Sequence, residues 1–528
     1  MTTPATYENI KPVPVVSKLS TRDVWAGAAA TTDAFMCNCY VNSTGEQAHA
    51  VKRPGLAAGL SLASLGLPST KALGLGPVGA NSGSGVGLVA IYGDTPGNIW
   101  AAAVLGVTGA ETLLSKKLLN FTALSISYPQ QPLPFRLGLA PGASVIGVSY
   151  IQGVWGIVAW DLGAGTMGTY WSGSPLHTRL TPSLCELNGS WYILSTDLTI
   201  QSTTSIENVP FDLIHSVQLN LRGGEAVTMV RYLSYLVAFQ TDSFTMYYDA
   251  GISPGAAIAP VPNGVFPIGC TLLGSEAVQV FDGIVYWVAG NTKSGYGVWS
   301  LAGTTPNPIS SPEIDRILYK YFVPTPGLLT GAIETIPPIR ALAAGISGHS
   351  LYLLTLPTYT LNGVTYTGMT LCYDIELQLW NVWTQSVGGV DAEMQMMYTA
   401  INTWTGEQVF IDSLTGGLSS LDSRTYQDLG QPLTVTLQTD PHDWGNQRTK
   451  LIPATYVQAD TLASSCLLSW SDSDYGVFTA AQTVSTANLK KQVLRCGSTT
   501  QRAWRLQHID NTPMRFYGLE VEVVPGAL

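Results

Sequence analysis

The chain has 528 residues, of which 46% are hydrophobic and only 11% are charged, and its formal net charge is −10 at pH 7. This length exceeds the size at which a single hydrophobic core stops growing, so more than one domain is expected. The low charged fraction argues against a mainly helical protein, because the solvent faces of helices need Lys, Glu and Arg. Without a cluster of basic residues, the chain also lacks the signature of a tight nucleic-acid binder.

Residues 1–58 do not match the pattern of the rest of the chain. Pro12 and Pro14 keep its beginning extended, because proline fixes φ and removes a backbone donor. Residues 38–41 (Asn-Cys-Tyr-Val) are typical of a strand, and residues 52–56 (Lys-Arg-Pro-Gly-Leu) are typical of a turn. We therefore expect residues 1–58 to form an extended N-terminal arm that packs on the outside of the fold or contacts a neighbouring subunit.

Residues 59–428 repeat a hairpin-like pattern, in which an apolar or aromatic run, a turn of Gly, Asn or Asp and a second run follow one another. Such pairs of runs occur at 86–92 and 99–104, 143–152 and 154–161, 233–238 and 244–248, 284–288 and 298–301, and 351–356 and 369–373. The repeat spacing of roughly 50 residues is typical of propeller blades. We predict an all-β protein in which residues 59–428 form a β-propeller of six or seven blades. A sandwich repeat is the structural alternative, because spacing alone does not show that a ring closes.

Aromatic residues recur at matching places in these repeats, namely Trp160, Tyr247, Trp299 and Trp380. We expect their rings to pack between neighbouring blades. Helical periodicity is scarce throughout, and the best helix candidate is the short segment 111–119.

The pattern changes after residue 428. Alternating apolar and polar residues at 432–438, 451–458 and 515–523 predict further strands. We predict a separate β-sandwich or barrel-like domain over residues 429–528. Within it, residues 472–478 (Asp-Ser-Asp-Tyr-Gly-Val-Phe) resemble an Asp-box, a turn in which an Asp side chain bonds turn amides and an aromatic ring packs below. We interpret this turn as structural.

The seven Cys residues are an odd number without CxxC spacing. This pattern favours buried, reduced thiols over a disulfide framework or a zinc site, and it suggests assembly in a reducing cytosol. The most apolar stretch, 55–67, is too short to span a bilayer, so no membrane span is expected.

Motifs for catalysis and cofactor binding are scarce. Residues 74–79 match GxGxxG, but Pro77 and the Gly/Ser-rich stretch after it do not fit the strand–loop–helix context of a dinucleotide site, so we interpret the match as a loop. The six His residues lack neighbours at metal-ligand spacing, and adjacent residues such as His442 and Asp443 point to opposite faces of a strand. We therefore predict a protein that is not an enzyme, with no catalytic residue, no cofactor-binding residue and no metal ligand.

Propeller enzymes are the enzymatic alternative. A sialidase needs arginines that converge on the substrate carboxylate, and the candidates in this chain are Arg222, Arg231, Arg316 and Arg340. A glycosidase needs two carboxylates at a defined separation, and the candidates are Glu225, Asp249 and Glu276. The sequence does not show that either set converges.

An ordered set of segments does resemble one known family. Residues 231–251 form a strand, a turn and a strand that end in an aromatic pair and Gly, and residues 280–288 and 297–301 follow in order. Together with 38–41 and 53–56 (Arg-Pro-Gly-Leu), this set resembles the tail nozzle proteins of short-tailed bacteriophages such as P22, also called tail hub or packaged-DNA stabilisation proteins.

The resemblance implies a structural virion protein of the phage tail that is assembled in the cytoplasm of the bacterial host. Six copies would form a homohexameric ring below the adaptor, or head-completion protein, that joins portal and tail, with a tail needle or fibres as further partners. The ring would close the channel to retain packaged DNA and conduct the genome at ejection, without sequence-specific binding. The net charge of −10 adds the expectation that acidic side chains line the bore of the ring. The alternatives are a propeller-based glycan-binding adhesin and a propeller glycosidase.

Overall fold

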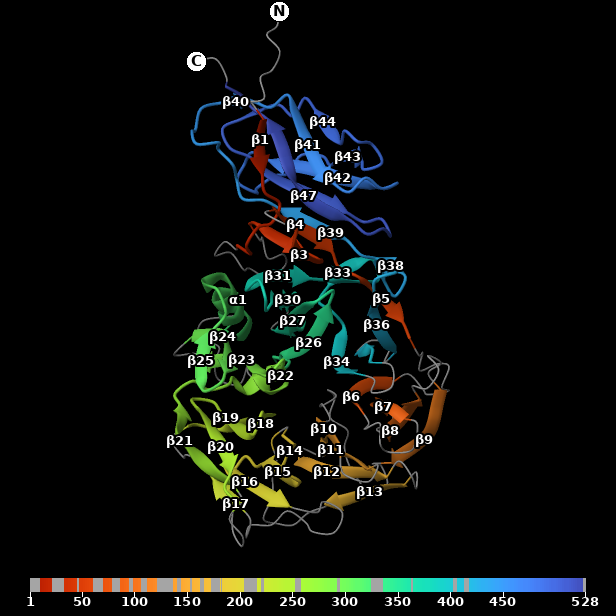
Figure 1. Ribbon diagram of the computed structural model, residues 1–528, viewed down its shortest axis with the longest axis vertical. Coiled ribbons are helices and arrows are strands. Elements are labelled where there is room, and N and C mark those ends of the chain that lie inside the picture. The colour runs from red at the N-terminus through yellow and green to blue at the C-terminus, as the bar shows by residue number, and fades with distance from the viewer. Residues whose placement is uncertain are drawn as a thin grey trace, which may run out of the picture.

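The computed structural model of the protein consists mostly of β-strands (Figure 1). It describes residues 10–20, 33–44 and 47–59, the strands between 70 and 171, and residues 181–525 except 182, 204–215, 220–222, 252–257, 292–294, 324–335, 362–363, 402–405 and 413–416. Within these ranges the helical elements are α1 (Pro312–Phe322) and the 3-10 helix η5 (Leu272–Ala277). No helix in the described ranges is long and apolar enough to cross a membrane.

Seven antiparallel four-stranded units follow one another along the chain, six as separate sheets and one within a nine-stranded sheet. Unit 1 is β6 (Thr70–Pro77), β7 (Val86–Asp94), β8 (Asn98–Leu105) and β9 (Thr112–Asn120); unit 2 is β10 (Arg136–Leu139), β11 (Ser144–Ile151), β12 (Val154–Asp161) and β13 (Thr166–Trp171). Unit 3 is β14 (Cys185–Leu187), β15 (Ser190–Leu194), β16 (Thr199–Thr203) and β17 (Ser216–Gln218); unit 4 is β18 (Ala226–Tyr232), β19 (Tyr235–Gln240), β20 (Phe244–Asp249) and β21 (Ile258–Phe266). Unit 5 is β22 (Gln279–Phe281), β23 (Ile284–Asn291), β24 (Gly295–Ala302) and β25 (Thr305–Pro308).

The last two units depart from the simple meander. Unit 6 is β26 (Arg340–Ile346), β27 (His349–Leu356), β30 (Met369–Asp374) and β31 (Leu379–Trp383), with the hairpin β28 (Tyr359–Leu361) and β29 (Val364–Tyr366) between its second and third strands. Unit 7 is β34 (Met396–Ile401), β35 (Gln408–Asp412), β36 (Leu418–Asp422) and, from the other end of the chain, β5 (Gly55–Ala58). The last unit is therefore completed by a strand that precedes the first unit.

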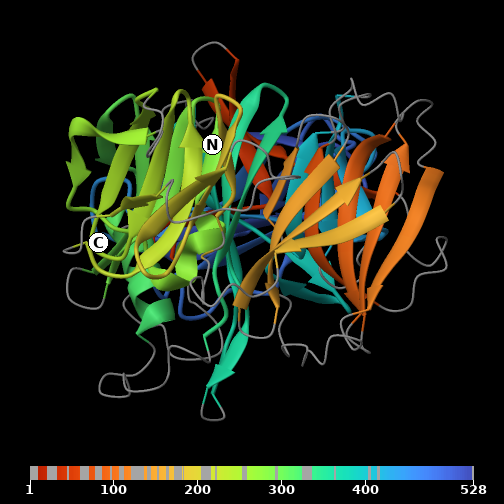
Figure 2. The same cartoon turned by 90° about the horizontal axis from the view of Figure 1, so that it is seen from below.

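For six of the seven pairs of neighbouring units, all but units 2 and 3, the first strands contact one another: β6 with β10, β14 with β18, β18 with β22, β22 with β26, β26 with β34, and β34 with β6. The seventh unit thus lies against the first, and in Figure 2 the strands of neighbouring units stand side by side. The short hairpins β32 (Gln385–Val387) with β33 (Val390–Ala392), and β37 (Gln427–Asp428) with β38 (Gln431–Pro432), follow units 6 and 7.

The remaining strands gather at the end of the molecule that carries both termini (Figure 1). The nine-stranded sheet continues from β31 through β2 (Phe35–Cys37) to β39 (Val435–Gln438), β46 (Ala503–His508), β42 (Ser465–Ser471) and β43 (Gln482–Ser485). The six-stranded sheet contains β1 (Ile10–Val13), β3 (Cys39–Thr44), β4 (Gln47–Lys52), β47 (Arg515–Glu522), β41 (Ala454–Ala459) and β44 (Gln492–Leu494). A three-stranded sheet is formed by β45 (Ser498–Thr499), β40 (Lys450–Leu451) and β48 (Val524–Pro525).

The described N-terminal strands therefore lie within these sheets, where the sequence predicted an outer arm. Strands β1 and β4 pair with β47, and β2 lies between β31 of unit 6 and β39 of the C-terminal segment. One sheet consequently runs across the expected boundary at residue 428, and the N-terminal segment joins the two parts. The reason is that strand pairing is satisfied by any free edge, however distant in the chain.

Two local expectations are wrong. Residues 112–120 form the strand β9, paired with β8, because pairing along a sheet outweighs a short helical preference. Residues 70–77, which include most of the GxGxxG match, form the strand β6 and not a loop. Residues 78–79, at the end of that match, lie outside the described residues.

The helix α1 was missed although its signals are present in the sequence. Ser311 is the N-cap and Pro312 occupies the first turn, where a missing backbone donor costs nothing. Its buried residues are Ile314, Ile317, Leu318, Tyr321 and Phe322, at the spacing of one helix face, and they join the core between units 5 and 6.

The thiols and aromatic rings follow the expectations where they are described. All seven Cys residues are free and buried. Tyr247 and Trp380 are buried, and Trp380 Nε1 donates to the carbonyl of Ile309 at 2.9 Å, which joins unit 6 to the segment after unit 5. Trp299 is partly buried, and the side chain of Trp160 lies outside the described part.

Candidate functional site

A buried polar network lies where the N-terminal segment meets unit 7 and the C-terminal sheets. Arg53 and Asp428 are both fully buried and form an ion pair, with distances of 2.5 Å from Nη2 to Oδ2 and 3.0 Å from Nη1 to Oδ1. The two parallel bonds match the planar fork of the guanidinium to the carboxylate. The guanidinium also lies 5.1 Å from the ring centroid of Trp383, so its face is covered.

Asn38 extends this network to the segments on either side. Its Oδ1 accepts hydrogen bonds from Arg53 Nε at 3.2 Å and from the backbone N–H of Thr384 at 2.8 Å. Its Nδ2 donates to the carbonyl of Thr434 at 2.8 Å. Asn38 has a φ of 58°, a left-handed conformation that asparagine tolerates better than most residues. One side chain thereby holds the N-terminal segment, unit 6 and the start of the C-terminal part together.

A second buried network lies within the C-terminal part. Lys52 is 1% exposed, and its Nζ donates to the carbonyl of Asp510 at 2.7 Å and lies 3.3 Å from His508 Nδ1. His508 Nε2 lies 2.9 Å from Ser464 Oγ, which donates to Asp510 Oδ2 at 2.8 Å. Because an ammonium only donates, Nδ1 of His508 accepts and Nε2 carries the proton. His508 therefore cannot take the proton of Ser464, and this pair is not an activated nucleophile.

Burial gives the Lys52 network a pH dependence. Desolvation and the neighbouring charge of Arg53 lower the Lys52 pKa to about 8, while Asp510 and Asp428 oppose the shift. The unfolded chain, with a lysine pKa of 10.5, binds more protons than the folded chain between these values. We therefore expect the contribution of Lys52 to stability to rise as pH increases from about 8 to 10.5, by about 3 kcal/mol in total.

Urea denaturation of the wild type and of Lys52→Met across this pH range tests the expectation. Lys52→Met should be more stable than the wild type at neutral pH, and this difference in the free energy of unfolding should disappear at high pH. The same difference between the two proteins at every pH would contradict it.

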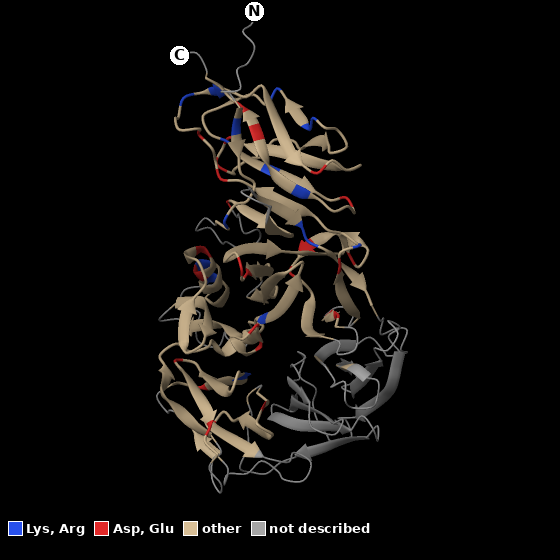
Figure 3. Cartoon of the chain, in the orientation of Figure 1, with Lys and Arg blue, Asp and Glu red and all other residues tan. Residues whose placement is uncertain are grey.

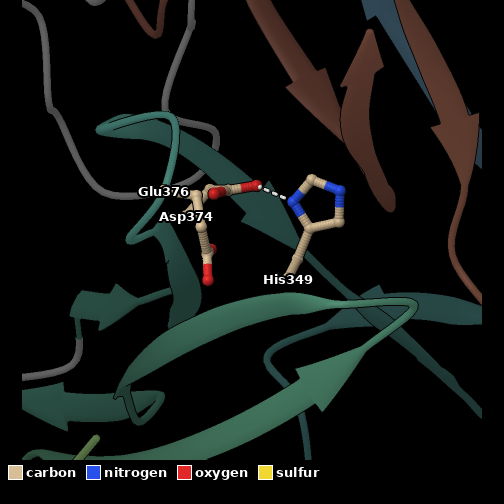
Figure 4. A group of neighbouring side chains, drawn as sticks. All are labelled: His349, Asp374 and Glu376. Carbon is tan, nitrogen blue, oxygen red and sulfur yellow. Dashed lines mark hydrogen bonds and ion pairs between the residues drawn. The ribbon is translucent and has the colours of Figure 1, made fainter. Parts of the chain in front are cut away.

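A third cluster, at the turns of unit 6, brings together three residue types that bind metals (Figure 4). One ligand atom each of His349, Asp374 and Glu376 lies within 4.8 Å of the others. His349 begins β27, and the two acids lie at the end of the paired strand β30 and in the turn after it. This cluster was not predicted from the sequence, because cross-strand pairing, and not spacing along the chain, brings its members together.

The hydrogen bonds of this cluster show what it does in the fold. His349 Nδ1 lies 2.9 Å from Asp374 Oδ2, and Asp374 Oδ1 accepts from the N–H of Leu377 at 3.1 Å. Both oxygens of Glu376 accept from the N–H of Ser350, at 3.1 and 2.9 Å. Burial raises the pKa of Asp374, whereas these hydrogen bonds lower the pKa of Glu376. The group has the composition to hold a divalent cation, and its hydrogen bonds fasten two turns together.

The arginines considered for a sialidase have separate surroundings. Arg231 on β18 pairs with Glu186 at 2.7 Å, and Arg316 on α1 pairs with Glu313 at 3.2 Å. Arg340 begins β26, where burial lowers its pKa, and Arg222 lies outside the described residues.

The carboxylates considered for a glycosidase also occupy separate places. Asp249 accepts from Asn188 Nδ2 at 2.7 Å, and that hydrogen bond is the main cause of its lowered pKa. Glu276 is buried in η5, and Glu225 lies in the turn before β18. In the described part of the chain, neither set of candidates forms an assembled catalytic site.

In the C-terminal part, residues 472–478 and the adjacent pair His442 and Asp443 form contacts within the fold. The carboxylate of Asp472 accepts hydrogen bonds from the guanidinium of Arg502 at 2.6 and 2.8 Å. The guanidinium of Arg505 lies 3.6 Å from the ring centroid of Phe478. Burial lowers the pKa of His442, whose backbone bridges to Arg502, while Asp443 accepts from the N–H of Gly445.

Comparison with known proteins does not assign this chain to a family. No family model and no curated protein matches it. Among solved structures, similarity is found to a chain of the S. cerevisiae complex of a Dbp5 variant with Nup159, a Gle1 variant, IP6 and ADP, with a TM-score of 0.39 and 12% identity over 72% of this chain and 97% of that chain. The N-terminal domain of Nup159 matches with a TM-score of 0.37 and 11% identity, over 73% of this chain and 98% of that chain. The computationally designed Ika8 protein matches with a TM-score of 0.35 and 10% identity, over 67% of this chain and 97% of that chain. At these values the similarities say nothing about activity or partners.

Proposed function

We propose that the protein is the nozzle, or hub, of a short phage tail, and that units 1 to 7 form a seven-bladed β-propeller. The pairing of β5 with β36 and the contact of β34 with β6 support a ring closed by an N-terminal strand. Such closure covers the apolar faces of the first and last sheets, which an open row of sheets would leave exposed.

The observation that carries the proposal is the place of the motif Arg53-Pro54-Gly55-Leu56. This motif carries part of the sequence resemblance to tail nozzle proteins. In the structure Arg53 forms the buried ion pair with Asp428, and residues 55–58 form the closing strand β5. The residues that resemble the family therefore hold the architecture together, as expected for a protein whose function is mechanical.

The distribution of charge is compatible with this role. In Figure 3 few positions on the described strands carry the colours of Lys, Arg, Asp or Glu. The protein has few charged residues and a net charge of −10. A ring of such subunits would let DNA, a polyanion, pass without binding it tightly. In this proposal six copies form the ring on the adaptor protein, in the virion tail, and close the channel until DNA is ejected.

Electron microscopy of the purified protein, alone and mixed with a candidate adaptor ring, tests the proposal. We expect sixfold cones that seat on the adaptor and that have an acidic bore. Single particles that ignore the adaptor would contradict the nozzle, and a strongly positive bore would contradict the expected DNA path. If single particles do not bind the adaptor, a glycan-binding adhesin becomes the better interpretation of the propeller.

A further inference from the structure

A cavity of about 390 Å³ opens between units 4 and 5, away from the networks described above. It is bordered by the turn between β19 and β20, by the neighbouring ends of β23 and β24, and by the first turn of α1. Its volume falls within the range of ~300–1,000 Å³ that is usual for small-molecule sites. The nozzle function gives this cavity no role.

Gly269 and Gly297 are among the residues that line the cavity. A Cβ on Gly297 would lie 3.1 Å from both Asp315 Oδ1 and Ser310 Oγ, and would fill the space above them. A Cβ on Gly269 would lie only 2.0 Å from the carbonyl oxygen of Thr241, so the wall is formed by closely approaching backbone. A side chain at either glycine would therefore crowd atoms of residues that line the cavity.

The polar groups of the cavity are fixed in place. Ser310 Oγ accepts from the N–H of Val298 at 3.0 Å and donates to Asp315 Oδ1 at 2.5 Å. Burial raises the pKa of Asp315, which lies in the first turn of α1. Asp242 is a second carboxylate among the lining residues, and the lining residues that the structure describes include no Lys or Arg.

Two aromatic rings complete the lining. The ring of Tyr296 stacks on Phe322 of α1, with centroids 4.4 Å apart and an interplanar angle of 28°. Trp299 Nε1 lies 3.7 Å from the position that a Cβ of Gly297 would take, so its indole borders the same hollow as Asp315. Amphipathic rings beside carboxylates offer an apolar face and hydrogen-bond acceptors together.

We infer that this cavity binds a neutral saccharide. Carboxylates accept hydrogen bonds from sugar hydroxyls, and the aromatic rings contact the C–H face of a pyranose. Acidic sugars are disfavoured, because their carboxylate would face the carboxylates of Asp242 and Asp315. The inference goes beyond the proposed function and does not depend on it.

Binding of a panel of neutral monosaccharides and disaccharides (glucose, galactose, mannose, N-acetylglucosamine, lactose and maltose) to the purified full-length protein tests the inference. Saturation-transfer NMR and tryptophan fluorescence at tens of millimolar sugar are the readouts. We expect at least one neutral sugar to bind, and sialic acid not to bind.

Matched glycine variants locate the site. Gly297→Ala should weaken binding about tenfold or more, because its methyl group occupies the cavity. Gly345→Ala is the control, since a Cβ there meets nothing within 4 Å. Asp315→Asn keeps the shape and removes the charge, and should also weaken binding, with an unchanged thermal midpoint showing that the fold is intact.

Two results would overturn the inference. The first is that no neutral sugar of the panel binds, or that binding is the same in Gly297→Ala and in the wild type. The second is that tetramethylammonium binds and is lost in Asp315→Asn while no sugar binds, which would make the cavity a cation site.

Discussion

Arg53→Ala should lower the free energy of unfolding by about 3–5 kcal/mol, because it leaves the buried carboxylate of Asp428 without its partner. Asp428 also accepts from the backbone N–H of Leu56 at 3.0 Å, so the loss extends to the closing strand. Urea denaturation at neutral pH measures the effect. The variant should also lose the cover that the guanidinium gives to Trp383.

Arg424→Ala is the matched control for this prediction. Arg424 also pairs with an aspartate, Asp422 at 2.9 Å, but its side chain is 88% exposed. Exposed ion pairs are screened by solvent and contribute little to stability, so this variant should be nearly neutral. In addition, the double variant Arg53→Met with Asp428→Leu should be more stable than Arg53→Ala alone, because it leaves no buried charge. Equal losses in Arg53→Ala and Arg424→Ala would show that the ion pair does not hold the junction.

Ala57→Pro should destabilise the protein by about 3 kcal/mol or more, because it breaks the strand that completes unit 7. Ala57 lies opposite Ser420 in the register of β5 and β36. The N–H of Gly59, two residues later, donates to the carbonyl of Leu418 at 2.7 Å, and the alternation of an antiparallel ladder directs the N–H of Ala57 to β36 as well. Proline at 57 removes this donor. Thermal unfolding and limited proteolysis report the loss of closure.

Ala58→Pro provides the comparison at the neighbouring position. By the same alternation its N–H points away from β36, and the residue is exposed. Its effect should therefore be small. If both proline variants unfold at the same temperature, β5 is not needed to complete unit 7, and the proposed ring closure loses its support.

Composition and local sequence pattern predicted the secondary-structure class and the burial of the thiols. The low charged fraction, the repeated runs and the turn residues indicated a β-rich protein, and the seven scattered Cys residues indicated buried thiols, because these features depend on residue type and near neighbours. The helix α1 could also have been predicted, because Ser311, Pro312 and the apolar spacing that follows are local signals. Residues 111–119 were misjudged because a strand in a sheet is decided by its partner, β8.

The pairing of distant segments could not be predicted from the sequence. Nothing local indicates that β5 pairs with β36, that Arg53 meets Asp428 or that His349 meets Asp374. The cavity of Tyr296, Trp299 and Asp315 likewise forms only where two units and a helix approach one another. Backbone hydrogen bonds can be satisfied by any strand of suitable register, so the choice of partner depends on how the whole chain packs, and the residues of a site come together only through that choice.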